Sequence, residues 1–139
     1  MKPVTLAVLF LLATIGCSES VATKVDPAIG GYTLTAVNSK PLPASVQATG
    51  NITSSTAIGG SIFLDKDGTY TGIVEFRIVR GTVTTIEPYG VPDGTWRRAT
   101  DTELQLIPRT GNEATVRGLT AGSLLTVLAQ GLNYQYTKR

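Results

Sequence analysis

The chain has 139 residues, about the length of a single domain. It contains no histidine and one cysteine, and its 12 Lys and Arg outnumber its 10 Asp and Glu by only two. The commonest general base and metal ligand is therefore missing, and one thiol can form neither an internal disulfide nor a thiolate zinc cluster. Binding to nucleic acid requires a strongly basic surface, which a net charge of +2 does not indicate, so we expect no nucleic-acid partner.

The first 17 residues are typical of an export signal. Lys2 precedes an uncharged, largely apolar run at residues 3–16, which is shorter than the roughly 20 residues of a spanning helix. Ala13-Thr14-Ile15-Gly16-Cys17 then resembles the lipobox of bacterial lipoproteins, in which the peptidase cuts before a lipid-modified cysteine. The resemblance implies a signal peptide at residues 1–16, a lipid on Cys17 and anchoring in the cell envelope. The alternative is ordinary secretory cleavage that leaves a free thiol.

The next segment, residues 17–30, is polar, contains Pro27 and has no apolar periodicity. We interpret it as a linker between the lipid and a folded domain at residues 31–139. Ser18 follows the cysteine where an Asp would retain a lipoprotein at the inner membrane, so the lipoprotein resemblance implies sorting to the outer membrane.

From residue 31 the chain consists of short runs rich in Thr, Val, Ile and Tyr, separated by Gly, Asp, Asn and Pro. The clearest strand is residues 69–80, where apolar and polar side chains alternate. A turn ending at Gly68 joins it to a strand at residues 61–64. Further strands are expected at residues 32–37, 82–86, 94–98, 103–107, 114–119, 123–129 and 132–137.

These nine candidates become eight strands if one of them extends its neighbour. The pattern thus predicts an all-β domain: an antiparallel up-and-down meander that closes into a small eight-stranded barrel. A two-sheet sandwich is the alternative. Residues 41–60, which contain Pro41, Pro43 and a stretch rich in Thr, Ser and Gly, are expected to form a long loop with at most a short edge strand or helical turn. Such a loop is either a lid over the barrel mouth or simply mobile.

Five segments carry a family resemblance: residues 31–34 (GYTL), 37–43 (VNSKPLP), 64–70 (LDKDGTY), 93–96 (DGTW) and 134–139 (YQYTKR). Together they are similar to the small lipocalin-like, calycin-type domains of bacterial envelope lipoproteins. Lipocalins carry a Gly-x-Trp in the first strand with a late basic residue over its ring, and Tyr32 stands at that place here. The resemblance covers residues 31–139 and implies a lipocalin-like β-barrel with a binding or structural role.

Catalytic and metal-binding patterns are weak. Asp65-x-Asp67-Gly68 begins like a calcium loop, but Tyr70 and Phe76 occupy positions that need glycine and glutamate. No spacing brings two carboxylates together, and a Ser-His pair is impossible. We therefore expect no enzymatic activity, no metal and no cofactor.

Inward-facing aromatic residues are the candidate ligand contacts, together with Arg98, which shares a strand face with Trp96 and could bind a ligand carboxylate. The same side chains would equally make a filled core. The expected ligand-lining residues are Tyr32, Tyr70, Phe76, Trp96, Arg98, Tyr134 and Tyr136.

Two functions fit these observations. The first is a membrane-anchored envelope lipoprotein whose barrel binds a small apolar ligand without catalysis. The second is a structural or interaction module with a filled barrel that docks another envelope protein. The strand at residues 123–129 bears on the second, because Leu124 and Leu128 on one face alternate with Leu125 and Val127 on the other, and an apolar outer face needs a cover.

Overall fold

A computed structural model of the chain describes residues 24–89, 93–110 and 114–139, all strands and connecting turns. The expected signal peptide and Cys17 lie outside the described residues. Within the described part of the chain, no helix is long and apolar enough to cross a membrane.

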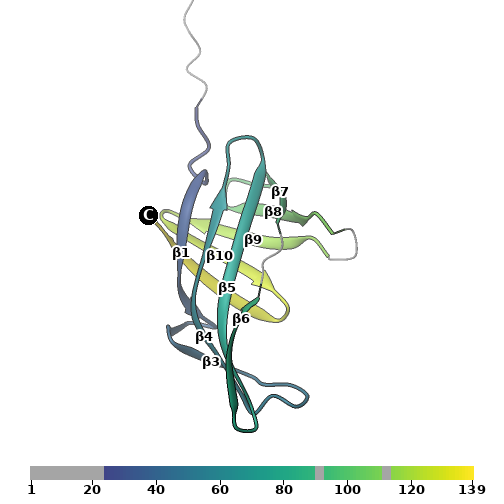
Figure 1. Cartoon of the computed structure of the whole chain (residues 1–139). Helices are drawn as coiled ribbons and strands as arrows, with labels where there is room; N and C mark the ends of the chain where they lie inside the picture. Colours follow the sequence, from purple (N-terminus) through teal and green to yellow (C-terminus); the bar gives the residue numbers. More distant parts are fainter. Residues whose placement is uncertain (1–23, 90–92, 111–113) are drawn as a thin grey trace, which may run out of the picture.

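Eight strands form a closed antiparallel barrel, as the sequence predicted (Figure 1). Each strand pairs with the next one along the ring, and β1 completes the ring by pairing with both β11 and β4. The barrel strands are β1 (Gly30–Val37), β4 (Ser54–Leu64), β5 (Thr69–Arg80), β7 (Gly94–Arg98), β8 (Glu103–Pro108), β9 (Val116–Ala121), β10 (Leu124–Ala129) and β11 (Leu132–Lys138).

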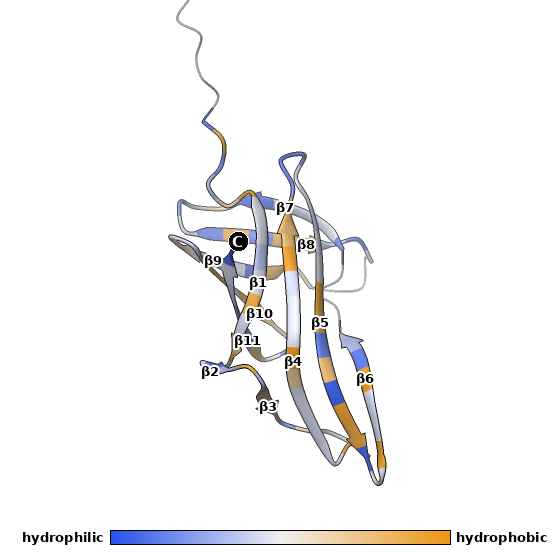
Figure 2. Cartoon of the chain, turned by 60° about the vertical axis from the view of Figure 1, so that its left-hand side comes forward, coloured by the Kyte–Doolittle hydropathy of each residue, from blue (hydrophilic) through white to orange (hydrophobic). Residues whose placement is uncertain are grey.

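Three further strands lie outside this ring. The short strands β2 (Lys40–Pro41) and β3 (Ala44–Val46) pair with β1 and β4. Among the described strands, β6 (Val83–Tyr89) pairs only with β5. Because β5 meets β7 only at its first two residues and pairs with β6 from Val74 onward, the β5–β6 hairpin extends past the ring at one end (Figures 1 and 2).

The barrel interior holds the core. In β5, Tyr70, Val74, Phe76 and Ile78 are buried while the residues between them are more exposed, which confirms the predicted alternation. Strand β10 likewise turns Leu125 and Val127 inward and leaves Leu124 at the surface. Burial of these apolar side chains supplies most of the driving force for folding.

The prediction of a long loop at residues 41–60 was wrong for much of this segment. Strand β4 begins at Ser54, seven residues before the expected start, and β3 is the short edge strand. The sequence pattern does not reveal the first half of β4, because its inward residues, Ser55 and Ala57, are small and two glycines follow. Small side chains still form a strand when partners on both sides supply the hydrogen bonds, as β3 and β5 do here.

Part of the expected linker belongs to the folded domain. Ala28 is buried in the core, and the Tyr32 hydroxyl donates a 2.7 Å hydrogen bond to its carbonyl oxygen. Asp26 forms an ion pair with Arg98 of β7. The described fold therefore extends back to Asp26, before the expected boundary at residue 31.

Candidate functional site

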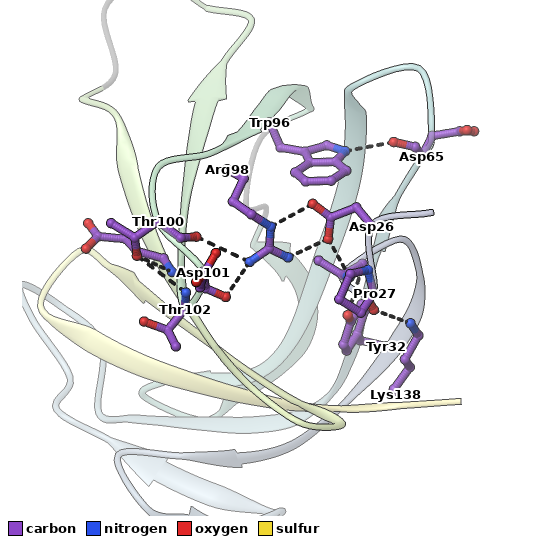
Figure 3. A network of polar contacts seen from close by, with 12 residues as sticks. Asp26, Pro27, Tyr32, Asp65, Trp96, Arg98, Thr100, Asp101, Thr102 and Lys138 are labelled. Carbon is purple, nitrogen blue, oxygen red and sulfur yellow. Dashed lines mark hydrogen bonds and ion pairs between the residues drawn. The ribbon is translucent and has the colours of Figure 1, made fainter. Parts of the chain in front are cut away.

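One end of the barrel is covered by the N-terminal segment and held by an ion pair (Figure 3). The Arg98 guanidinium donates to both carboxylate oxygens of Asp26 and to the carbonyl oxygens of Thr100 and Asp101. Both side chains of the pair are about three-quarters buried, being 23% and 25% exposed. The hydrogen bond from Arg98 lowers the pKa of Asp26 below its ordinary value. Arg98 is thus engaged by the protein itself.

Two aromatic residues complete this closed end. The Trp96 indole donates a 2.8 Å hydrogen bond to the carbonyl oxygen of Asp65, in the β4–β5 turn. The Lys138 ammonium lies 5.7 Å from the centre of the Tyr32 ring and donates to the carbonyl oxygen of Pro27. A basic side chain of β11 thus lies over the aromatic ring of a β1 tyrosine.

At the opposite end, a cavity of about 650 Å³ opens between the β3–β4 loop, the ends of β5 and β6, and the β10–β11 turn. Of the expected ligand-lining residues, the structure brings only Phe76 and Tyr134 to this cavity. Tyr32, Trp96 and Arg98 lie at the closed end instead. The apolar residues that line the cavity are Val46, Ala48, Ile52, Phe76, Ile78, Leu132 and the rings of Tyr89 and Tyr134.

Aromatic rings form one wall of the cavity. Phe76 and Tyr89 meet edge to face, with ring centres 5.9 Å apart and planes at 82°. Tyr134 is almost fully buried, and burial, with a smaller effect from the nearby Tyr89, raises the pKa of Tyr134 to about 12. The hydroxyl therefore stays neutral at physiological pH.

The rim of the cavity carries one ion pair. Arg80 and Glu87 form two hydrogen bonds between guanidinium and carboxylate, and the Thr85 hydroxyl adds a third to Glu87 at 2.7 Å. The hydrogen bonds from Arg80 and then Thr85 lower the pKa of Glu87 to about 2. No other lining residue of this cavity is charged, so the described lining carries no net charge.

The remaining two expected residues, Tyr70 and Tyr136, are buried in the packed interior and do not line the cavity. Burial raises the pKa of Tyr136 far above its ordinary value. The described interior is therefore packed around Tyr70 and Tyr136, and the cavity opens at the opposite end of the barrel.

Sequence reasoning missed the β6 side of the cavity. Tyr89 and Glu87 lie beyond the expected strand at residues 82–86, because Pro88 favours a strand end. Proline is tolerated here since, in the part of the chain that the structure describes, β6 pairs on one side only. Tyr89, an aromatic residue three positions after the expected end of the strand, was the sequence signal that could have indicated a longer strand. The β3–β4 loop, at residues 47–53, was considered as a lid, and it does contribute four residues to the cavity lining.

No cluster of three or more metal-ligating side chains occurs among the residues that the structure describes. Comparisons of the chain with protein-family models, with curated proteins and with solved structures find no match.

Proposed function

We propose that the protein is a membrane-anchored envelope lipoprotein whose lipocalin-like barrel binds a small apolar molecule without catalysing a reaction. The observation that carries this proposal is the cavity of about 650 Å³ between Phe76 and Tyr134. Its volume lies within the roughly 300 to 1,000 Å³ of small-molecule sites, and about half of its lining residues are apolar or aromatic, the others being mostly polar. Burial of a ligand's apolar surface there would drive binding.

The construction of β4 supports this proposal. Ser55 and Ala57 face inward at the cavity end of the strand, where larger side chains would fill the space. Phe76 and Ile78 of the neighbouring strand β5 pair with these two small residues and line the cavity themselves. The cavity thus results from small side chains on β4 that lie beside large side chains on β5.

Titration with the apolar fluorophore N-phenyl-naphthylamine tests binding directly. Ser55→Phe places a ring in the cavity, so we expect binding at least about tenfold weaker than in the wild type. The matched control is Thr56→Phe, on the same strand but outside the cavity lining, which should bind as the wild type does. Equal affinity in both variants, or no binding to the wild type, would contradict the proposed cavity.

The anchor is tested separately, on Cys17. Nine positions separate Cys17 from Asp26, so a lipid on Cys17 would keep the closed end within about 30 Å of the bilayer. In cells fed radiolabelled palmitate, we expect label on the wild type and none on Cys17→Ser. Label that survives the substitution would place the lipid elsewhere, and an unlabelled wild type would contradict lipidation.

One observation favours the alternative of an interaction module. Val83 and Ile86 of the edge strand β6 are 60% and 63% exposed, and Figure 2 shows hydrophobic positions along this hairpin. An edge strand of this kind can receive an extended strand of another envelope protein. Ile86→Ser should then abolish a specific crosslink to that protein while fluorophore binding persists. An unchanged crosslinking pattern would remove this alternative.

A further inference from the structure

Two hydroxyl groups belong to the deeply buried part of the cavity wall. Ser55 of β4 and Tyr134 of β11 both line the cavity and are only 8% and 3% exposed. The other polar side chains of the lining are more exposed. Neither the Ser55 nor the Tyr134 hydroxyl has a hydrogen-bond partner among the residues that the structure describes. Both are therefore free to bond a molecule that enters.

Both hydroxyl oxygens reach open space. Tyr136, deeper in the barrel, shows the opposite case, because its oxygen is sealed in the packed core without a partner. Ser55 and Tyr134 are not among the described residues with an oxygen sealed in this way. Since their side chains face the barrel interior and line the cavity, the space that they reach is the cavity. A molecule that fills it contacts both hydroxyls.

Tyr134 is the stronger hydrogen-bond donor of the two. Burial, with a smaller effect from Tyr89, raises its pKa to about 12, so the hydroxyl keeps its proton at physiological pH. An apolar ligand that offers it no acceptor would leave a buried donor unpaired, which is unfavourable. Ser55 is the second residue of β4 and pairs with Ile78, one inward position from Arg80 at the rim, so solvent can still serve its hydroxyl.

The charges around the cavity constrain the ligand further. Arg80 and Glu87 at the rim neutralise each other through two hydrogen bonds. Phe76 and Tyr134, which line the cavity farther in, carry no charge. A carboxylate or ammonium group placed beside them would lose its hydration without gaining a counter-ion, which is strongly unfavourable.

We propose that the ligand is an apolar molecule with one uncharged hydrogen-bond acceptor, such as a ketone or ester carbonyl, and that the Tyr134 hydroxyl donates to this acceptor. The inference rests on the proposed ligand-binding function and specifies its ligand class. The apolar part of the ligand lies against Phe76 and Ile78.

Displacement of N-phenyl-naphthylamine by three probes tests this inference: methyl octyl ketone, decyl chloride of similar length but poor acceptor strength, and decanoate. Tyr134→Phe should bind the ketone about tenfold more weakly than the wild type and the chloride equally well. Decanoate at pH 8 should bind the wild type at least about tenfold more weakly than the ketone.

Two matched controls remove other hydroxyls of the same cavity. Tyr89→Phe makes the same change in a half-exposed tyrosine, and Ser55→Ala removes the hydroxyl nearer the rim. Both variants should keep the wild-type preference for the ketone over the chloride. A preference lost in either control but kept in Tyr134→Phe would overturn the assignment of the donor.

Ketone and chloride affinities that change together, or not at all, in Tyr134→Phe would overturn the inference and leave ligand binding intact. Decanoate binding as tightly as the ketone would overturn the uncharged ligand class. A wild type that binds neither the fluorophore nor any probe would instead defeat the proposed function itself.

Thermal unfolding of the free proteins supplies a second readout. Tyr134→Phe removes a hydroxyl that no described residue bonds, so its Tm should equal or exceed that of the wild type. Tyr32→Phe loses the hydrogen bond to the Ala28 carbonyl oxygen and should have a lower Tm. A lower Tm for Tyr134→Phe would mean that the hydroxyl is already satisfied in the free protein, which overturns the inference.

Discussion

At the scale of single residues, the position of Arg98 depends on a contact that no local pattern reveals. Alternation along its strand correctly placed Arg98 on the face of Trp96, and an inward arginine in a barrel is a reasonable ligand contact. Its actual partner, Asp26, lies 72 positions earlier, in a segment whose composition favours a linker. A partly buried arginine needs a counter-charge, and the chain supplies it from its own N-terminal segment.

Asp26→Asn should lower the free energy of unfolding at pH 7 by about 1 to 2 kcal/mol, because the charge-assisted pair with Arg98 is lost. Arg98 lowers the pKa of Asp26 below its ordinary value of 3.8 in the folded protein. The stabilisation is therefore fully present above pH 3.8 and disappears as the pH falls through the lower, folded-state value. Urea titrations of both proteins from pH 7 to pH 2 measure the difference, and a pH-independent difference would refute the assignment.

At the scale of elements, β4 shows how a strand without large side chains is held in place. Gly60 lies against β5: a Cβ there would come within 2.6 Å of the Ile73 carbonyl oxygen and 3.3 Å of the Leu34 side chain. Gly59, directly before it, meets only the flexible Glu75 carboxylate, at 3.5 Å. Gly60 is therefore required because the backbones of β4 and β5 approach each other closely there, whereas Gly59 is not required for that reason.

Gly60→Ala should therefore destabilise the protein by about 1 to 3 kcal/mol, because β4 and β5 must separate to admit the methyl group. Gly59→Ala is the matched control, and we expect it to change stability by less than about 0.5 kcal/mol. Chemical denaturation of the two variants provides the comparison. Equal stabilities would show that β4 and β5 do not approach each other as closely as described.

At the scale of the whole molecule, the barrel has one tight end and one loose end. The closed end combines ring closure through β1 with the Asp26–Arg98 pair and the Trp96 hydrogen bond. At the other end, β6 pairs with a single strand among the described ones (Figure 1). The cavity lies between the strands and loops of this end. Local stability should therefore decrease from the closed end to the mouth.

Hydrogen exchange should reveal this gradient. Amides of β6 and of residues 47–53 are expected to exchange faster than those of β10 and β11, which are paired on both sides. A bound apolar ligand should slow exchange at the mouth more than at the closed end. Uniform protection across the barrel, with or without ligand, would contradict this distribution of stability.

The sequence by itself determined the fold class and most strand positions, because alternation and turn residues are local. Strands β5 and β7 have the expected bounds, and Gly68 ends the expected turn. The same alternation put Phe76 and Tyr134 on the inward face. The sequence could not identify which inward residues line the cavity. Alternation assigns a side chain to one face of a strand and not to a position along the barrel axis.

Only the tertiary structure decided the position of each inward side chain along the barrel axis. Pairing across the ring puts small residues of β4 beside Phe76 and Ile78, which leaves the cavity at that end. It also brings Asp26 to Arg98 and so closes the other end. These arrangements depend on residues far apart in the chain, and their energies arise from packing and charge pairing that exist only once the ring has formed.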